Sequence, residues 1–397
     1  MVSSAISQSN LWTKTKSFLT KKSVLLSVWL LIAFIATSKQ FLTNSYNNYL
    51  IFKYTYFHAL EHVNLYIKYP EYQDVNHYGP FFSVLIAPFA LLPDYIGMLL
   101  WQLTNTLLLF WAITKLPLKE NQKIIMLWLC SHELLTSTLS FQINPSIAAI
   151  LILTFVCIER KQDFWAALFI MLGTFVKLYG IVGLAFFFFS KQKMKFIVSC
   201  IFWAIILFIL PMIFFSPTYI IQSYADWYQN LITKNHANTT LSSMQDISLM
   251  GLTRRLMHNA DLPNLPFLIS SLLLFSVPYL RIKQYKNLAF QLMFVASTLL
   301  FIVLFSTGSE SPTYIIAFTG VALWFVVQPQ PYKITPIVLL IFALTLTSFS
   351  PSDLFPRYLR EVYVVPYALK ALPCVLIWIS IVYEMITKDF SLYTTKE

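Results

Sequence analysis

Charged residues are scarce in this sequence: only 11% of its 397 residues are Asp, Glu, Lys or Arg, against about 25% in soluble domains. Apolar residues make up 57%, and the mean hydropathy is +0.66. These values exclude an ordinary soluble domain. Acidic residues are the rarer kind, with 17 Asp and Glu against 28 Lys and Arg. The basic residues form short clusters between apolar runs, which favours the positive-inside pattern of a membrane protein over nucleic-acid binding.

Cysteine is also rare, and the common cofactor motifs are missing. Cys130, Cys157, Cys200 and Cys374 each lie within an apolar run, and no Cys-x-x-Cys pair occurs. We therefore expect neither a disulfide nor a metal site from them. The sequence contains no HExxH, no P-loop and no GxGxxG, so the motifs of zinc hydrolases, nucleotide hydrolases and dinucleotide enzymes are absent. We expect no metal and no cofactor.

Long uncharged runs are abundant, for example residues 24–38, 265–280 and 289–305. They are apolar on every face, which excludes the alternating strands of a membrane barrel. With their polar flanks they approach the ~17 to 25 residues of a spanning helix. The fold class is therefore an all-α polytopic membrane protein. We expect twelve spans, at about 23–40, 96–115, 124–141, 145–159, 163–177, 178–190, 196–215, 264–280, 287–305, 313–329, 333–349 and 366–386.

The charge distribution predicts the orientation of these spans. If residues 1–22 and 387–397 are cytoplasmic tails, the cytoplasmic side receives 18 Lys and Arg residues in short segments, and the outer side receives eight in longer loops. The lysines before the first span also resemble a signal peptide, but residues 36–39 (Ala-Thr-Ser-Lys) make a poor cleavage site, so an uncleaved first span is favoured.

Two outer loops are long, 41–95 and 216–263, and loops of this length usually carry function or fold into helices of their own. In the first loop, residues 47–62 and 81–92 are apolar but too short to span, so we expect helices lying at the membrane interface. No repeat or soluble domain interrupts the chain. Residues 1–397 are expected to form a single transmembrane unit.

Three charged residues fall within expected spans, where insertion costs at least ~2.5 to 3.5 kcal/mol each. Lys177 lies at the outer turn of a short hairpin, 164–190, whose arms reach only ~20 Å, so we expect it in a protein-lined cavity below the outer surface. An anionic ligand such as a lipid phosphate is one explanation for Lys177, and snorkelling or a carboxylate partner is the other. For Glu133 and His132 a structural polar contact is the main alternative to catalysis, and Lys370 is expected to snorkel.

The first outer loop concentrates side chains that can accept a proton. Glu61, Glu71, Asp74 and His77 lie within 17 residues that are rich in tyrosine. A general base for a hydroxyl group is a carboxylate or an imidazole, and Asp74 and His77 fit this role. The alternative is a solvated loop with ordinary charges and an interfacial aromatic belt.

Several short segments, taken in order, resemble the bacterial glycosyltransferase family 87, whose members have the GT-C fold and use polyprenyl-phosphate sugars. The resemblance covers about 40–330. The order in which the matching segments occur along the chain is more specific than any single segment. They are Asn47-Asn-Tyr-Leu-Ile-Phe, Asn64-Leu-Tyr, Tyr78-Gly-Pro-Phe-Phe, Ala87-Pro-Phe-Ala-Leu-Leu-Pro, Trp101-x-x-x-Asn105, Gln142-x-Asn144, Ala166 to Gly173 leading into Lys177-x-Tyr179-Gly, Trp227, and Ser248-Leu-Met-Gly251.

This resemblance implies a GT-C-like bundle in which a first-loop carboxylate acts as base and basic residues hold the lipid phosphate. Asn48 stands near the position of the acidic residue in active members, so we take Asp74 as the base, with Glu61 second. Lys177 and Tyr179, with Arg254 or Arg255, are the expected phosphate contacts. Gln142 and Asn144 are expected to contact the sugar or phosphate, although Asn144 before Pro145 is equally suited to capping a helix.

The leading hypothesis is thus a glycosyltransferase of the bacterial inner membrane. It would move a hexose or pentose from a polyprenyl-phosphate carrier to a lipid-linked or cell-envelope glycan acceptor on the outer face, without a metal. Its expected partners are these two substrates and membrane lipids, and no nucleic acid. Two alternatives remain: a transporter or flippase for a polyprenyl-linked lipid, and a catalytically degenerate membrane scaffold, which the asparagine at position 48 motivates.

Overall fold

The computed structural model describes residues 19–393, and this part of the chain is helical throughout, without a β-strand. Lys14, Lys16 and Lys396, which contributed to the charge count, lie outside the described residues. The first half contains α2 (Lys22–Leu42), α3 (Asn47–Leu60), α4 (Phe82–Ala90), α5 (Asp94–Lys115), α6 (Glu120–Thr138), α7 (Asn144–Glu159), α8 (Asp163–Lys177), a 3₁₀ helix (Tyr179–Phe189) and α9 (Lys193–Phe214).

The second half continues with two helices of the second long loop and then with the remaining apolar segments. These elements are α10 (Pro217–Asn238), α11 (Leu249–Leu256), α12 (Asn264–Ser276) with a 3₁₀ turn (Val277–Leu280), α13 (Leu288–Leu304), α14 (Tyr314–Val327), α15 (Ile334–Phe342) with a π-helical turn (Ala343–Phe349), α16 (Arg357–Leu359) and α17 (Leu372–Thr387). Each of the twelve apolar segments that the sequence singled out is helical over most of its length. The expected helices at 47–62 and 81–92 are confirmed as α3 and α4.

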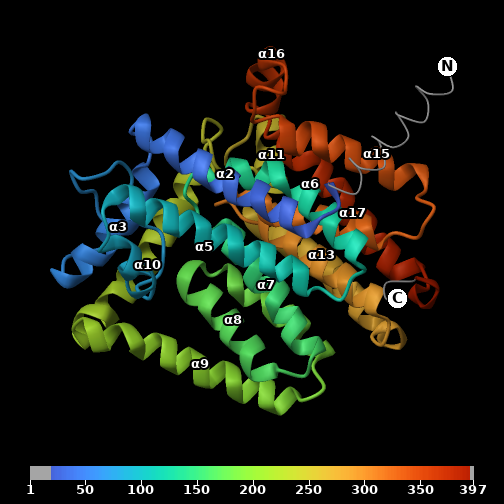
Figure 1. Cartoon of the computed structure of the whole chain (residues 1–397), viewed down its shortest axis with the longest axis horizontal. Coiled ribbons are helices and arrows are strands. Elements are labelled where there is room, and N and C mark those ends of the chain that lie inside the picture. Colours follow the sequence, from blue (N-terminus) through green and yellow to red (C-terminus); the bar gives the residue numbers. More distant parts are fainter. Residues whose placement is uncertain (1–18, 394–397) are drawn as a thin grey trace, which may run out of the picture.

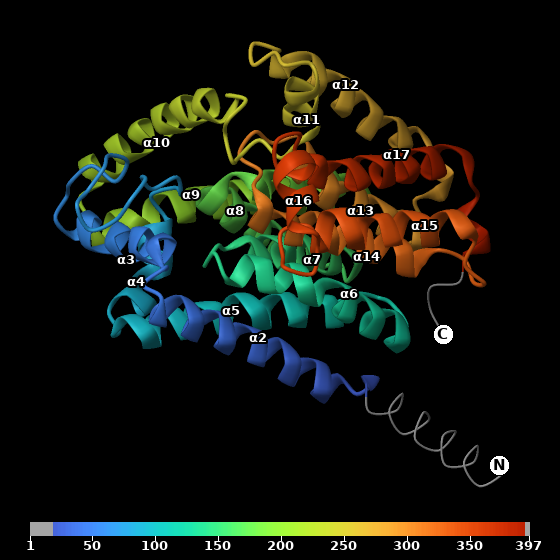
Figure 2. The same cartoon turned by 90° about the horizontal axis from the view of Figure 1, so that it is seen from above.

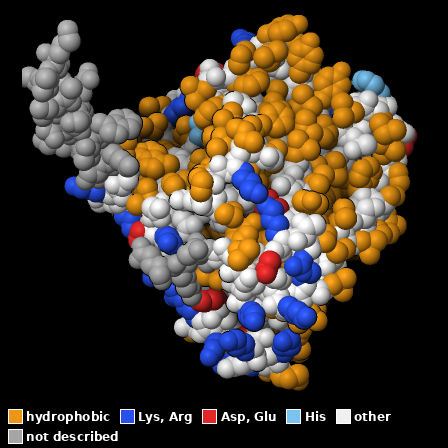
Figure 3. Space-filling model, turned by 90° about the vertical axis from the view of Figure 1, so that its right-hand side faces the viewer, with side chains coloured by type: hydrophobic (Ala, Val, Ile, Leu, Met, Phe, Trp, Pro, Cys, Tyr) orange, Lys and Arg blue, Asp and Glu red, His pale blue; other side chains and the backbone are white. Residues whose placement is uncertain are grey.

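Among the described residues, four helices are long and apolar enough to cross a membrane by length and composition: α2, α5, α9 and the segment Leu369–Thr387 that contains α17. Six further apolar helices have 10 to 17 residues. The chain is thus a helical protein with several candidate spans, while the number of twelve crossings stays a prediction. Figure 3 shows one face on which hydrophobic side chains cover a broad area and Lys and Arg gather toward one end.

One hydrophobic core runs through the bundle, from Leu25 in α2 to Phe390 beyond α17, and α7, α13 and α14 form its centre, with nearly every side chain buried. In both Figure 1 and Figure 2, α3 and α10 lie at one end of the molecule, and the N-terminal end of α2 and the C-terminal end of α17 lie at the other. The two long loops therefore share one end.

The basic clusters lie together at the opposite end. Lys115, Lys119, Lys123 and Arg160 line one surface depression, and the Arg281 guanidinium donates hydrogen bonds to the carbonyl oxygens of Ile386 and Lys388. The chain thus has one basic end and one end built from the long loops. This arrangement is the one that a positive-inside topology requires.

Two buried charged side chains inside the bundle, Lys370 and Glu133, form an ion pair. Lys370 Nζ lies 3.0 Å from Glu133 Oε1 and also donates to Ser311 Oγ at 3.0 Å. Both charged side chains are almost fully buried, 4% and 0% exposed. The structural contact expected for Glu133 is confirmed, and the expectation that Lys370 snorkels is wrong, because Lys370 points inward to a carboxylate on α6. His132 contacts Ser348 Oγ through Nδ1 at 3.1 Å.

Removing one partner of this ion pair should cost far more than removing both. Lys370→Met leaves the Glu133 carboxylate buried and unpaired, so we expect the free energy of unfolding to fall by about 3 to 5 kcal/mol. The double variant Lys370→Met/Glu133→Leu should recover most of that loss. Denaturant unfolding in detergent micelles measures both. A double variant no more stable than the single one would contradict the pairing.

Candidate active site

A polar cavity of about 350 Å³ opens where the two long loops meet. Its walls come from segments far apart in the sequence: α3, the end of the first loop, the turn after α8, the second half of α10, and the loop between α13 and α14. The side chains that carry charge or hydrogen-bonding groups into it are Asn48, Asp74, His77, Gln142, Lys177, Tyr179, Lys234, Asn235, Asn238, Gln245, Ser306, Thr307 and Glu310.

Lys177 reaches this cavity and begins a chain of polar contacts. Its Nζ donates to Asn144 Oδ1 at 2.9 Å, Asn144 Nδ2 donates to Gln142 Oε1 at 2.6 Å, and Gln142 Nε2 donates to Glu310 Oε1. The ammonium also lies 5.1 Å from the ring centroid of Tyr179 and 5.7 Å from that of Tyr78, within the range of cation–π attraction. The expected protein-lined cavity around Lys177 is confirmed.

The backbone of the hairpin places Lys177 there. The chain reverses at Leu178, which has a left-handed φ of 54°, a conformation that costs energy in a residue other than glycine and clusters at functional sites. Its two arms touch at a glycine: a Cβ added to Gly180 would lie 2.4 Å from the Ile170 carbonyl oxygen. Only glycine fits this approach, so the turn and the lysine that precedes it are fixed in position.

Asp74 and Lys234 form an ion pair in the same cavity. Lys234 Nζ lies 3.2 Å from Asp74 Oδ2, and His77 Nε2 lies 3.8 Å from Asp74 Oδ1. His77 and the Lys234 ammonium hold the pKa of the Asp74 carboxyl well below its ordinary value. A carboxylate whose charge is so strongly favoured is a weak proton acceptor. This pairing makes Asp74 less suited to the role of base than the sequence suggested.

Comparison with known families identifies the protein. The model of glycosyltransferase family 87 matches residues 76–307, which is more than half of the chain. This protein belongs to glycosyltransferase family 87. It is therefore a membrane glycosyltransferase, as the resemblance implied. No curated protein matches its sequence. Within residues 19–393, no cluster of three or more His, Cys, Asp or Glu side chains is arranged to hold a metal ion.

The glycosyltransferase cavity contains most of the residues that the sequence nominated. Asn48 lines it and donates through Nδ2 to the Ser140 carbonyl oxygen at 2.8 Å. Tyr179 lines it and shares a hydrogen bond of 3.0 Å with Ser306. Asn144 is fully buried beside it and makes no side-chain cap on α7. Asn144 is the first residue of α7 and not its N-cap, which is Ile143, and the Asn144 side chain accepts through Oδ1 from Lys177 rather than capping the helix.

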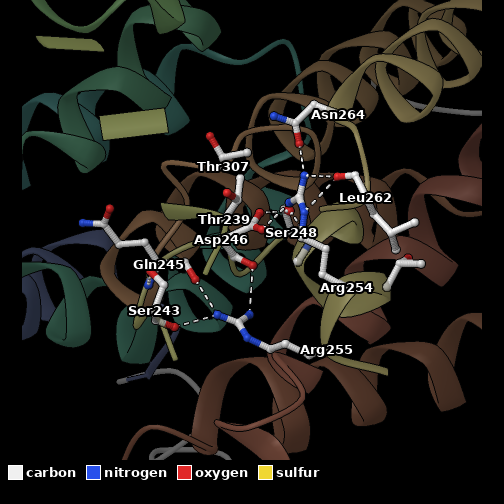
Figure 4. Close-up of polar contacts among 12 residues, drawn as sticks. Thr239, Ser243, Gln245, Asp246, Ser248, Arg254, Arg255, Leu262, Asn264 and Thr307 are labelled. Atoms are coloured by element: carbon white, nitrogen blue, oxygen red, sulfur yellow. Dashed lines mark hydrogen bonds and ion pairs between the residues drawn. The ribbon is translucent and has the colours of Figure 1, made fainter. Parts of the chain in front are cut away.

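Glu61, Arg254 and Arg255 are not brought into this cavity. Glu61 is exposed at the end of α3. Figure 4 shows that the two arginines point into the second loop itself. Arg254 binds Asp246 Oδ2 at 2.5 Å, the Leu262 carbonyl oxygen and Asn264. Arg255 donates to the carbonyl oxygens of residues 243, 245 and 246. Their donors are occupied by protein atoms, so they do not form a phosphate clamp with Lys177 here.

These arginines instead brace the loop that closes the cavity. Burial raises the pKa of the Asp246 carboxyl, and Arg254 compensates its charge. The backbone N–H groups of Asp246 and Ile247 donate to the carbonyl oxygens of Thr307 and Ser309 at 3.0 and 2.8 Å. The second long loop is thereby attached to the 306–310 loop, and Gln245 of the former and Thr307 of the latter both line the cavity.

Two charged cavity residues were missed from the sequence. The sequence assigns Lys234 only to the outer basic residues. Its contact with Asp74 becomes evident only in the folded chain, where α10 covers the first long loop. Glu310 precedes Ser-Pro at the start of the last central helix. That pattern marks the start of a helix, so it could have placed Glu310 at the end of an apolar span, but it gives no indication that Glu310 lies beside Gln142.

The cavity continues sideways into an apolar groove. A pocket of about 320 Å³ shares Leu178, Tyr179, Asn235, Ser306 and Thr307 with the cavity and extends between the 3₁₀ helix, α12 and α13. A further pocket of about 250 Å³ adjoins it at Phe305 and lies between α12 and α17. We call these two pockets together the lateral groove; its apolar lining includes Val182, Leu268, Phe301, Phe305, Leu274 and Trp378.

Replacing Arg254 tests whether it braces the loop or binds a substrate. In Arg254→Leu the Asp246 carboxylate stays buried without its partner, so we expect stability to fall by about 3 to 5 kcal/mol and residues 239–262 to become sensitive to limited proteolysis. Arg357→Leu is the matched control, since Arg357 is exposed in its ion pair with Glu361. Unchanged protease resistance together with weaker donor binding would favour the phosphate-binding role instead.

Proposed function

We propose that this glycosyltransferase moves a sugar from a polyprenyl-phosphate carrier to a lipid-linked or cell-envelope glycan acceptor on the outer face of a bacterial inner membrane. The observation that carries the proposal is the continuity between the Lys177 cavity and the lateral groove. A polar cavity with cations, joined to an apolar groove, is complementary to an amphiphile that has an anionic head and a hydrocarbon tail.

The lateral groove supports a lipid carrier over a soluble sugar nucleotide. Apart from Ser270 and Ser271, the pocket between α12 and α17 is lined by apolar side chains. The adjacent face of α12 is exposed and apolar, with Leu265 and Leu273 both 64% exposed, as expected for a helix that faces lipid. A prenyl chain in this groove would pass from the bilayer to the cavity without crossing water.

Within the cavity, two lysines are suited to hold the carrier phosphate. Lys177 and Lys234 both line it, and ammonium groups form strong charge-assisted hydrogen bonds to phosphate oxygens. Their attraction stabilises the negative charge that the phosphate gains as the sugar leaves, so the proposed reaction needs no metal. The opposite end of the molecule carries the basic clusters, which supports cytoplasmic termini and a site on the outer side.

Lys177→Ala should weaken donor binding strongly. The loss of one charge-assisted hydrogen bond costs about 1.5 to 3 kcal/mol, so we expect the KM for a radiolabelled polyprenyl-phosphate hexose to rise roughly 10- to 100-fold. The assay uses purified protein with a lipid-extract acceptor. Lys68→Ala is the matched control, because Lys68 is exposed on the first long loop and does not line the cavity.

The same preparation separates this proposal from its two rivals. A flippase would scramble labelled polyprenyl-phosphate lipid in proteoliposomes and transfer no sugar. A degenerate scaffold would do neither, and Asn48→Asp would then restore transfer only if the rest of the site were intact. Sugar transfer by the wild type that is reduced by Lys177→Ala and not by Lys68→Ala supports the proposed function; equal transfer by all three removes Lys177 from the site.

The lateral groove makes a separate prediction about chain length. Leu268→Asn places an amide in the groove, so affinity for the long-chain donor should fall about tenfold, from the loss of an apolar contact worth about 1.5 kcal/mol. Affinity for an analogue with a methyl group in place of the prenyl chain should not change. Leu273→Asn, on the same helix but outside the groove, is the control. Equal losses for both analogues would contradict this route for the lipid.

A further inference from the structure

Glu310 is the second carboxylate of the cavity, and neither the family match nor the resemblance assigns it a role. It lies in the loop between α13 and α14, three residues beyond the matched region. Its carboxylate accepts a hydrogen bond from Gln142 Nε2, and its backbone N–H donates to Thr313 Oγ1 at 3.3 Å. The side chain thus ends in the cavity rather than in solvent beyond it.

The two cavity carboxylates differ in their partners. Asp74 is ion-paired with Lys234 and close to His77. Glu310 forms no ion pair with any residue between 19 and 393, and its side-chain partners are neutral amides: the Gln142 side chain and the Thr313 backbone N–H, from which it accepts a hydrogen bond in a capping box. An ion pair favours the ionised form and opposes proton uptake. A carboxylate held by an amide keeps its orientation and can still accept a proton. Of the two, Glu310 is the better general base.

Glu310 also has a defined relation to the proposed phosphate site. Lys177, Asn144, Gln142 and Glu310 follow one another through hydrogen bonds along one wall of the cavity. The cation at one end and the carboxylate at the other are therefore separated by two amide side chains. A sugar whose phosphate lies on Lys177 would have its reacting carbon between them, beside amides suited to hydrogen-bond its hydroxyl groups.

The loop that carries Glu310 is fixed from two sides. On one side, Thr307 and Ser309 accept backbone hydrogen bonds from residues 246 and 247, which Arg254 and Arg255 brace (Figure 4). On the other side, Ser311 accepts a hydrogen bond from Lys370, which is paired with Glu133. The two ion pairs, Arg254–Asp246 and Lys370–Glu133, thus both adjoin this short loop. A catalytic group gains most when its position is fixed before the substrate binds.

We propose that Glu310 is the general base of the transfer reaction, an assignment that rests on the proposed function. The acceptor hydroxyl oxygen forms the new bond to the anomeric carbon, and the bond from that carbon to the phosphate oxygen breaks, with its electron pair remaining on the phosphate. The hydroxyl proton passes to the Glu310 carboxylate, which later releases it to water. The products are the glycosylated acceptor and polyprenyl phosphate.

The experiment compares Glu310→Gln, Glu310→Ala and Asp74→Asn with the full-length wild type in the assay with the radiolabelled donor. We expect Glu310→Gln to lower kcat by about 100-fold or more, the usual contribution of a general base, with the donor KM changed less than threefold. Asp74→Asn removes a counter-ion of Lys234 and not the base, so its kcat should fall less than that of Glu310→Gln.

Chemical rescue distinguishes a missing base from a disturbed loop. In Glu310→Ala, sodium formate should restore kcat at least tenfold, while sodium chloride at equal ionic strength should not, because only formate supplies a carboxylate. Absence of rescue, or loss of kcat in Asp74→Asn but not in Glu310→Gln, would overturn the assignment to Glu310 alone. A wild type that transfers no sugar would overturn the proposed function, and the assignment with it.

Discussion

A charge that lies among apolar helices is tolerated only if a partner meets it there, and this requirement organises the molecule around its cavity. Lys370 is paired with Glu133 inside the bundle, and Arg254 is paired with Asp246 in the second long loop. The first pair joins elements that are 237 residues apart in sequence, whereas the second joins residues eight positions apart within one loop. Both reach the loop between α13 and α14, so the cost of burying four charges is offset by contacts that also fix the position of one short catalytic segment.

The charges inside the cavity are not all paired directly. Lys177 and Lys234 face it together with Asp74 and Glu310, so the two positive charges are matched by two negative ones. Lys234 is held directly by Asp74, but Lys177 meets Glu310 only through Asn144 and Gln142. A phosphate can therefore approach Lys177 without first breaking an ion pair. Asp74 and Lys234 thus compensate each other's charge directly, whereas Lys177 and Glu310 remain available to a substrate.

The short hairpin formed by α8 and the 3₁₀ helix that follows it lines both the polar cavity and the lateral groove. Its tight turn presents Lys177 and Tyr179 to the cavity, while residues such as Leu178 and Val182 continue into the lateral groove. The same few residues thus line the polar and the apolar compartments. An arm of only 15 or 11 residues is too short to carry its turn to the far surface, and this shortness leaves room for a cavity at that depth.

The sequence by itself determined the helical class, the positions of the apolar helices, the family and six of the 13 polar residues that line the cavity, because apolar runs, basic clusters and the order of short motifs are local properties of the chain. It also placed Lys177 in a cavity, since the length of a helix follows from its residue count.

Only the tertiary structure decided which charges meet. Lys370 was expected to snorkel, Arg254 or Arg255 to bind phosphate, and Asp74 to act as the base, whereas Lys370, Arg254 and Asp74 are paired with Glu133, Asp246 and Lys234. These contacts join residues up to 237 positions apart, and no local pattern encodes them. Glu310 became a candidate for the same reason: its chemistry is readable from the sequence, but its place beside Gln142 is set by the packing of helices that the sequence does not order in space.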